Sequence, residues 1–305
     1  MDLFANANYD FLSKRKFAAI FSAILILIGL FSIIFHNGLR LGIDFQGGTL
    51  LQLQFDNPVQ IGDIRSALEG HGFANAEIQR FGAEDEVIIR VQQTSGGGTE
   101  TSDQIQTALS DALQDNPFQV RRTEEVGPQI GSELRGKAVL AILSAMLGMV
   151  IYITLRFELK FAVAAIIAIV HDVLVTLGVF SVLNLEINLP IIAAFLTIVG
   201  YSLNDTIVIF DRVRENLKSL RREAYNKLIN MSINQTLSRT IVTSVTTFLV
   251  VFVLWMWGGE VIRNFAFALV IGVVTGTYST IYIASPVVVE WESRSKSTGR
   301  LQRKR

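Results

Sequence analysis

Residues 189–210 decide the fold, and they read LPIIAAFLTIVGYSLNDTIVIF. Asp205 is the only charged residue in this run. A helix needs about 20 predominantly apolar residues to cross a hydrocarbon core about 30 Å thick, and this stretch is long enough to do so. The sequence therefore predicts a membrane-spanning helix that carries one carboxyl group.

Five further apolar runs of similar length lie along the chain. Apolar residues make up 50% of the 305 residues and charged residues 18%, whereas a soluble domain typically carries about 25% charged residues. We therefore predict a multi-pass α-helical membrane protein with six transmembrane helices, whose other spans are 17–35, 138–155, 161–183, 241–257 and 265–289. The first run is too long for a secretory signal and lacks a cleavage pattern of small residues, so we interpret it as an uncleaved anchor.

Basic residues gather on one side of the predicted spans. They cluster at 14–16, 156–160, 212–239 and 294–305. The two short loops on the opposite side contain one basic residue, Arg263. By the positive-inside rule, the N-terminal tail 1–16, the loop 211–240 and the basic tail 290–305 are cytoplasmic. We interpret the loop as a linker along lipid headgroups, with a docking surface for a cytoplasmic partner as the alternative.

Residues 36–136 form the one large polar segment, on the opposite side of the membrane from the termini. Its 15 Asp and Glu residues outnumber its seven Arg residues, and such an acidic surface does not suit nucleic acid. Apolar spacing predicts strands at 49–55, 77–81, 87–91 and 118–123, and helices at 61–68 and 103–113. The order β-α-β-β-α-β predicts a ferredoxin-like α+β domain, which precedes a five-helix transmembrane bundle at 137–289.

Asp205 is the first candidate functional residue, because burying a charge in lipid costs several kcal/mol. It lies five residues before the cytoplasmic end of its span, or about 8 Å inside the apolar zone. Thr197, Tyr201 and Asp205 recur at i, i+4 spacing, with Gly200 and Asn204 beside them. This pattern predicts one polar stripe on the helix. The alternative is a helix-packing stripe in which Asp205 is a structural hydrogen-bond partner.

Arg239 opens the fifth predicted span, and Thr243 and Thr246 continue its face at i+4 and i+7. Spans four and five run antiparallel, so Asp205 and Arg239 lie near the same depth. Protonation of the aspartate would cancel its attraction for the arginine, and the pair could therefore couple ion passage to movement. The alternative for Arg239 is an interfacial anchor whose charge reaches the headgroups.

His171 and Asp172 lie near the middle of the third predicted span, where an unpaired charge is most costly. Asp172 is either a second relay group or a structural partner for another helix. Gly272 and Gly276 in the sixth span have the spacing of closely packed helices, without chemistry of their own. The candidate ion-relay set is therefore Asp205, Arg239, Asp172, Asn204 and Thr243.

Signatures of enzymes and cofactor sites are missing from the sequence. The three histidines are scattered, there is no cysteine, and no P-loop or nucleophile elbow occurs. We therefore expect no enzymatic activity, no metal site and no cofactor. Any transport by this chain would depend on a coupling ion, and one carboxyl group is compatible with either a proton or sodium.

Five motifs together carry a resemblance to a known family. They are LGIDFQGG at 41–48, VGPQIGSEL at 126–134, HDV at 171–173, GYSLNDTIVIFDRVREN at 200–216 and SINQTLSRTIVTS at 232–244. In this order they resemble the SecF branch of the SecD/SecF family of protein-export membrane proteins. The family's key membrane aspartate matches Asp205, and its key arginine matches Arg239.

The resemblance implies a fold related to the resistance-nodulation-division transporters, in a bacterial inner membrane, with the large domain in the periplasm. It implies a SecD partner, the SecYEG channel, further accessory membrane subunits and an unfolded preprotein as substrate. The implied activity is late protein export driven by an ion gradient without ATP at this subunit. Half of a drug-efflux pump and a non-transporting scaffold are the alternatives. Efflux pumps usually carry two such halves in one chain, and a scaffold would not need Asp205 and Arg239.

Overall fold

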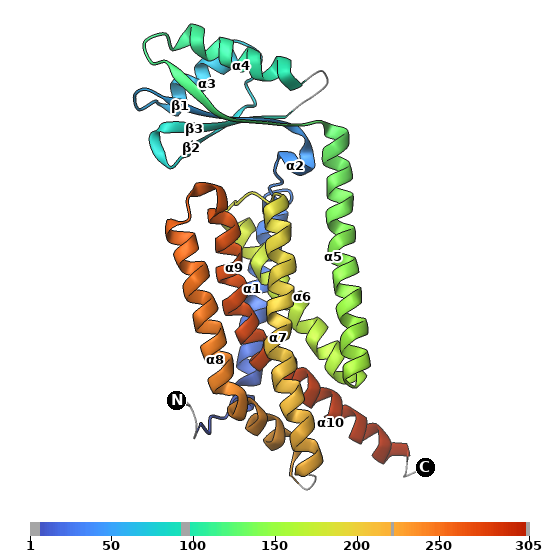
Figure 1. Cartoon of the computed structure of the whole chain (residues 1–305). Coiled ribbons are helices and arrows are strands. Elements are labelled where there is room, and N and C mark those ends of the chain that lie inside the picture. Colours follow the sequence, from blue (N-terminus) through green and yellow to red (C-terminus); the bar gives the residue numbers. More distant parts are fainter. Residues whose placement is uncertain (1–6, 93–97, 221–222, 303–305) are drawn as a thin grey trace. The chain divides into compact units, whose positions relative to one another are not determined.

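The computed structural model describes residues 7–92, 98–220 and 223–302. These residues divide into two compact units, coloured along the chain in Figure 1. A helical unit comprises Met1–Leu39, Ile142–Leu185 and Pro190–Arg305. An α/β unit comprises Arg40–Ala141 together with the short segment Glu186–Leu189.

Six helices of the described residues are long and apolar enough to cross a membrane. The prediction of a multi-pass helical membrane protein with six spans is therefore confirmed. The helices are α1 (Arg15–Phe35), preceded by η1 (Leu12–Lys14), then α5 (Pro128–Arg156), α6 (Leu159–Val182), α7 (Leu189–Ser219), α8 (Tyr225–Trp257) and α9 (Glu260–Ser279), which continues through the π-helix η2 (Thr280–Ala284) into α10 (Ser285–Gln302).

Segment 211–240, predicted as a helix-permissive loop between spans, is largely helical. Helix α7 continues to Ser219 and α8 begins at Tyr225, so both helices extend past their apolar stretches. Asn216 holds the extensions together, because its amide donates to Ser232 Oγ and to Gln235 Oε1, each at 2.8 Å. Apolar composition therefore marked only the part of each helix that suits lipid, whereas tertiary contacts extend the helix beyond it.

Close backbone approaches hold the helical unit together. A Cβ atom built on Gly29 of α1 would lie 2.5 Å from the Cα atom of Gly178 in α6. On α9, a Cβ atom on Gly272 would lie 2.2 Å from Ile198 of α7, and one on Gly276 would lie 3.2 Å from Ser202. The prediction of close packing at Gly272 and Gly276 is thus confirmed, and the partner helix is α7.

The α/β unit is a four-stranded antiparallel sheet with two helices. Its elements are β1 (Gly48–Phe55), α3 (Ile61–Glu69), β2 (Glu77–Phe81), β3 (Ala83–Val91), α4 (Gly98–Ala112) and β4 (Phe118–Val126). The strand order is β2-β3-β1-β4, with every neighbouring pair antiparallel. Helices α3 and α4 cover one face of the sheet (Figure 1), where Leu51, Leu53 and Ile89 meet Ile64 and Leu109 in a fully buried core.

The other face of the sheet carries the short helix α2 (Ile43–Gln46), whose Ile43 packs on Leu50 and Ile88. Gly47 and Gly48 join α2 to β1 with φ angles of +77° and +141°. A Cβ atom on Gly48 would lie 2.4 Å from the carbonyl oxygen of Val91. Only glycine adopts such backbone conformations without strain, so this pair allows the chain to turn directly into the sheet.

Segment Glu186–Leu189, between α6 and α7, is bound to residues 40–44 of the α/β unit. The amide of Ile187 donates to the Arg40 carbonyl and the amide of Gly42 donates to the Ile187 carbonyl, both at 2.8 Å. Arg90 pairs with Glu186 at 2.9 Å, and both side chains are largely buried. Burial lowers the pKa of Arg40, with Glu186 acting in the opposite direction. Backbone and charge contacts together hold this segment.

Candidate functional site

A buried carboxylate network centres on Asp172 of α6, whose side chain is 1% exposed. Its Oδ2 atom accepts hydrogen bonds from Ser202 of α7 and Ser279 of α9, each at 2.7 Å. Its Oδ1 atom lies 3.0 Å from Nδ1 of His171. A buried charge must be paired or hydrogen-bonded to be tolerated, and three partners from three helices meet that requirement.

The network continues from His171 to α1. Nε2 of His171 lies 3.0 Å from Ser22 Oγ, which lies 3.0 Å from the Tyr278 hydroxyl. Tyr278 donates to the carbonyl of Ala18 at 2.8 Å, and its ring stacks on His171 with centroids 5.8 Å apart. The polar network around Asp172 therefore links α1, α6, α7 and α9.

Asp205 of α7 lies in a second, smaller group. It is 3% exposed, its Oδ2 atom accepts a hydrogen bond from Ser244 of α8 at 3.3 Å, and the Thr243 side chain also interacts with it. Ser244 in turn accepts a hydrogen bond from Thr277 of α9 at 2.8 Å. Tyr201, one turn earlier on α7, interacts electrostatically with Asp205. Asp205 is thus as deeply buried as Asp172 but has fewer hydrogen bonds.

Arg239 lies near Asp205 without touching it. It is an exposed residue of α8 that interacts electrostatically with Asp205, and the described residues contain no ion pair between the two. Thr243 is half-buried, and its hydroxyl donates to the Arg239 carbonyl at 2.9 Å. The structure therefore brings the predicted pair into the same region but leaves the two charges separated.

The predicted polar stripe on α7 is wrong as a single face. Asp205 is buried, whereas Thr197, Gly200 and Asn204 are exposed. A helix turns about 100° per residue, so the eight residues from Thr197 to Asp205 add about 80° beyond two full turns. That rotation places Asn204 with Thr197 on an outer face and turns Asp205 into the interior.

A widened helical turn lies beside both networks. Residues Thr280–Ala284 form the π-helix η2, and the Ser285 hydroxyl donates to the Thr280 carbonyl at 2.9 Å. The hydroxyls of Thr280 and Thr206 lie 2.9 Å apart. Turns of this kind often mark functional sites in helices. Helix α9 carries both Ser279 and Thr277, so it contacts the group around Asp172 and the group around Asp205.

Within the described residues, no cluster of three His, Cys, Asp or Glu side chains could hold a metal ion. The carboxylates and hydroxyls of the two networks can exchange a proton or coordinate a small cation through oxygen. Ser22, Ser202, Tyr278 and Ser279 were not among the predicted site residues. Their hydroxyls are individually unremarkable in a sequence, because serine in a membrane helix commonly bonds to its own backbone.

Comparison with known proteins identifies the family. Residues 105–294 match the family model for protein export membrane protein SecD/SecF, C-terminal, and residues 32–59 match the SecD/SecF GG motif. This chain belongs to the SecD/SecF family. The resemblance inferred from its motifs is confirmed, and the GG match contains Gly47 and Gly48 at the start of β1.

Relatives within the SecD/SecF family match more than nine-tenths of the chain. The protein translocase subunit SecF of Calditerrivibrio nitroreducens is 49% identical, over 93% of this chain and 94% of that protein. SecF of Magnetococcus marinus is 46% identical, over 97% of this chain and 96% of that protein.

Two solved structures of SecDF have the same fold. SecDF from Thermus thermophilus, described as a translocon-associated membrane protein, is 38% identical with a TM-score of 0.85 over 95% of this chain. SecDF in a super-membrane-facing form has a TM-score of 0.72 over 97% of this chain, also at 38% identity. This SecD/SecF chain covers only 39% and 40% of those two chains.

Proposed function

We propose that this chain is a protein translocase subunit of the SecF type. With a SecD chain, it uses a proton or sodium gradient to promote late, ATP-independent export of unfolded preproteins through the SecYEG channel. The naming of its full-length relatives supports the translocase role. We propose no enzymatic reaction at this subunit, whose part is conformational.

The observation that carries the ion-coupling proposal is the state of Asp205. It is buried among helices, yet it is held only by a long hydrogen bond of 3.3 Å from Ser244 and an interaction with the Thr243 side chain, and it forms no ion pair with Arg239 within the described residues. A carboxyl group that is held weakly can change its charge without breaking the bundle. When Asp205 is charged it attracts Arg239, and when a proton or sodium neutralises it the attraction is lost. Movement of α8 relative to α7 would follow from that change.

The exposed face of α7 supports a SecD partner. Ala193, Thr197, Gly200 and Asn204 recur at three- and four-residue spacing and are all exposed. Small and polar residues of this kind favour close helix packing in membranes. The solved SecDF chains are more than twice as long as the part that this chain matches. We therefore propose that SecD helices cover this face, with accessory membrane subunits further out.

The distribution of basic residues supports a bacterial inner-membrane location with both termini cytoplasmic. The α/β unit would then lie in the periplasm, where it can contact emerging preprotein. Its acidic surface suits a protein substrate better than nucleic acid.

The test is an export assay in inverted membrane vesicles at fixed ATP, with and without an ionophore that collapses the gradient. Asp205→Asn removes the titratable charge but preserves size, so we expect it to abolish the gradient-dependent part of export. Asp205→Glu should retain part of it, and Arg239→Lys should be impaired because the planar fork is lost. Asp211→Asn is the matched control. It makes the same change on the same helix, where Asp211 pairs with Arg156 at 3.2 Å on a partly exposed surface.

Protein level and recovery of SecD with the variant must match wild type for the comparison to count. The ion-coupling assignment is refuted if Asp205→Asn exports at the wild-type rate with the same dependence on the gradient. Equal losses in Asp205→Asn and Asp211→Asn would show a general defect of α7 instead.

A further inference from the structure

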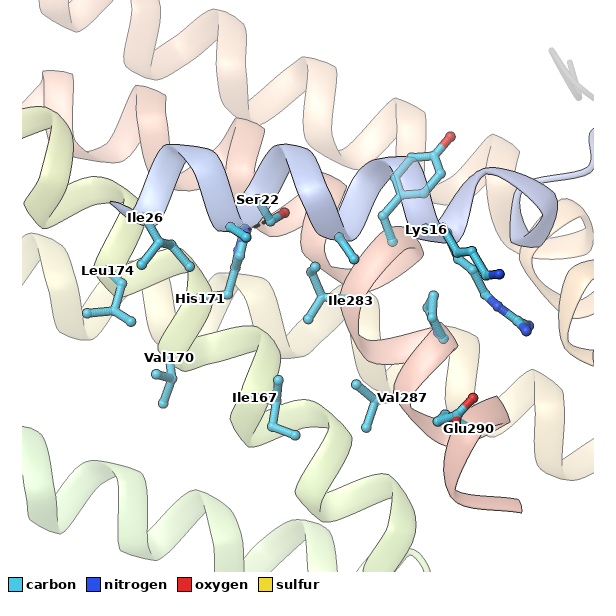
Figure 2. A pocket seen from close by; sticks show the side chains of 15 residues that line it. Lys16, Ser22, Ile26, Ile167, Val170, His171, Leu174, Ile283, Val287 and Glu290 are labelled. Carbon is cyan, nitrogen blue, oxygen red and sulfur yellow. Dashed lines mark hydrogen bonds between the residues drawn. The ribbon is translucent and has the colours of Figure 1, made fainter. Parts of the chain in front are cut away.

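An open groove of about 530 Å³ runs along the helical unit, between α1, α6 and the segment formed by η2 and α10. Apolar side chains form most of its wall, and Ile26, Ile167, Val170, Leu174, Ile283 and Val287 are among them. Figure 2 shows Lys16 and Glu290 at one end of the groove and Ile26 and Leu174 at the other. Ser22 and His171 lie between these ends and are joined by their hydrogen bond.

The charged end of the groove carries a local excess of positive charge. Arg15 and Lys16 both line it, and neither takes part in an ion pair within the described residues. Among the described residues, Glu290 is the one acid that lines the groove, and it already pairs with Arg294 at 3.0 Å. An anion that entered this end would therefore meet two cations and one acid whose charge is balanced by Arg294.

The length of the groove matches one leaflet of a bilayer. Lys16 and Ile26 are ten residues apart on α1, which corresponds to about 15 Å along the helix axis. Half of a hydrocarbon core of about 30 Å has the same depth. The positive-inside rule assigns the Arg15 and Lys16 end to the cytoplasmic surface. Cations therefore lie at headgroup level, and apolar walls extend from there toward the bilayer centre.

We propose that this groove binds one anionic phospholipid of the cytoplasmic leaflet. Its phosphate interacts with Arg15 and Lys16, and an acyl chain lies along the wall from Val287 to Leu174. Arginine suits this role because its planar fork can bond two phosphate oxygens at once. The polar floor needs no partner from the lipid, because Ser22 and His171 already bond to each other. A free phosphate ion would fill only the charged end and leave the apolar groove empty.

A lipid in this position would lie against the network around Asp172. Ser22 and His171 line the groove on one side and connect to Asp172 on the other. Occupancy of the groove would therefore stabilise the contact of α1 with α6, and the composition of the membrane would influence that contact.

The test uses the full chain, purified in detergent and titrated with phosphatidylglycerol or with phosphatidylcholine of the same acyl chains. Native mass spectrometry counts the bound lipid. Each cation near an anionic lipid contributes about 1 kcal/mol, so Arg15→Gln with Lys16→Gln should weaken phosphatidylglycerol binding about thirtyfold. Arg214→Gln with Lys218→Gln is the matched control, because it removes the same charge from exposed positions of α7 that do not line the groove.

A second variant, Ala23→Trp, fills the groove without changing its charge. It should also lower lipid occupancy, whereas excess inorganic phosphate should not displace the lipid from wild type. A lower lipid occupancy counts as a loss of binding only if the melting temperature of the variant, measured without added lipid, stays within about 2 °C of wild type.

Four results would overturn the proposal. The first is equal binding of the two lipids by wild type, and the second is wild-type affinity in the Arg15 and Lys16 double variant. The third is an equal loss in the control pair, which would show only general attraction to the surface. The fourth is loss of the bound lipid when the chain is purified with SecD, which would show that a partner helix covers the groove.

Discussion

The two buried carboxylates should differ in what they contribute to stability. Asp172 has three hydrogen-bond partners at 2.7, 2.7 and 3.0 Å, whereas Asp205 has a hydrogen bond of 3.3 Å from Ser244 and an interaction with Thr243. Side-chain hydrogen bonds between membrane helices contribute about 0.6 kcal/mol each on average. Loss of the two interhelical bonds at Asp172 therefore removes about 1 kcal/mol, to which loss of the bond with His171 on the same helix adds, while loss of the long bond from Ser244 at Asp205 removes less than about 1 kcal/mol.

Truncation of Asp172 also leaves its partners without an acceptor. Each buried donor that finds no new partner costs about 1–3 kcal/mol. Ser279 already shares its hydroxyl with the Gly276 carbonyl at 3.2 Å, so it can re-pair within its own helix. Among the described residues, Nδ1 of His171 has no second hydrogen bond of this kind. We therefore expect Asp172→Ala to lower the free energy of unfolding by about 2–4 kcal/mol, and Asp205→Ala by about 1 kcal/mol or less.

The assay is reversible unfolding in mixed micelles of dodecyl maltoside and sodium dodecyl sulfate, followed by tryptophan fluorescence. Asp172→Asn retains one acceptor oxygen and should fall between wild type and Asp172→Ala. Equal destabilisation by Asp172→Ala and Asp205→Ala would refute the reasoning, because it would show that the number of hydrogen bonds does not set the difference. A stable Asp172→Ala variant with lost gradient-dependent export would instead assign Asp172 to the ion relay.

Two further expectations concern packing and orientation. Gly178→Ala should lower the free energy of unfolding by about 1–3 kcal/mol, because the new Cβ atom would lie 2.9 Å from the Gly29 backbone. Gly148→Ala is the control, because there is open space around Gly148, and it should be neutral or stabilising in the same unfolding assay. Epitope tags at residues 2 and 305 should be protected from protease in intact spheroplasts and a tag near residue 97 should be cleaved; the opposite pattern would reverse the proposed orientation.

The fold was predictable to the extent that it depends on composition. Six apolar runs marked six helices because a bilayer demands about 20 apolar residues in each span. The same criterion missed the helical parts outside the apolar runs, such as 211–219 and 225–240. Those parts depend on contacts like that of Asn216 with Ser232, which join residues from two helices. Composition carries no information about such pairs.

The candidate site was predictable in its charges but not in its contacts. A carboxyl group inside a span is conspicuous, so Asp205 and Asp172 were found from the sequence. Their partners include serines, which occur at many other positions in the spans. Only the packing of α6 against α7 and α9 selects Ser202 and Ser279, and only the packing of α7 against α8 selects Ser244. Equal depth likewise indicated that Asp205 and Arg239 are neighbours, but depth leaves the rotation of each helix undetermined. That rotation places Arg239 on an exposed face and Asp205 in the interior, so an ion pair between them requires the Arg239 side chain to change its conformation or α7 or α8 to move.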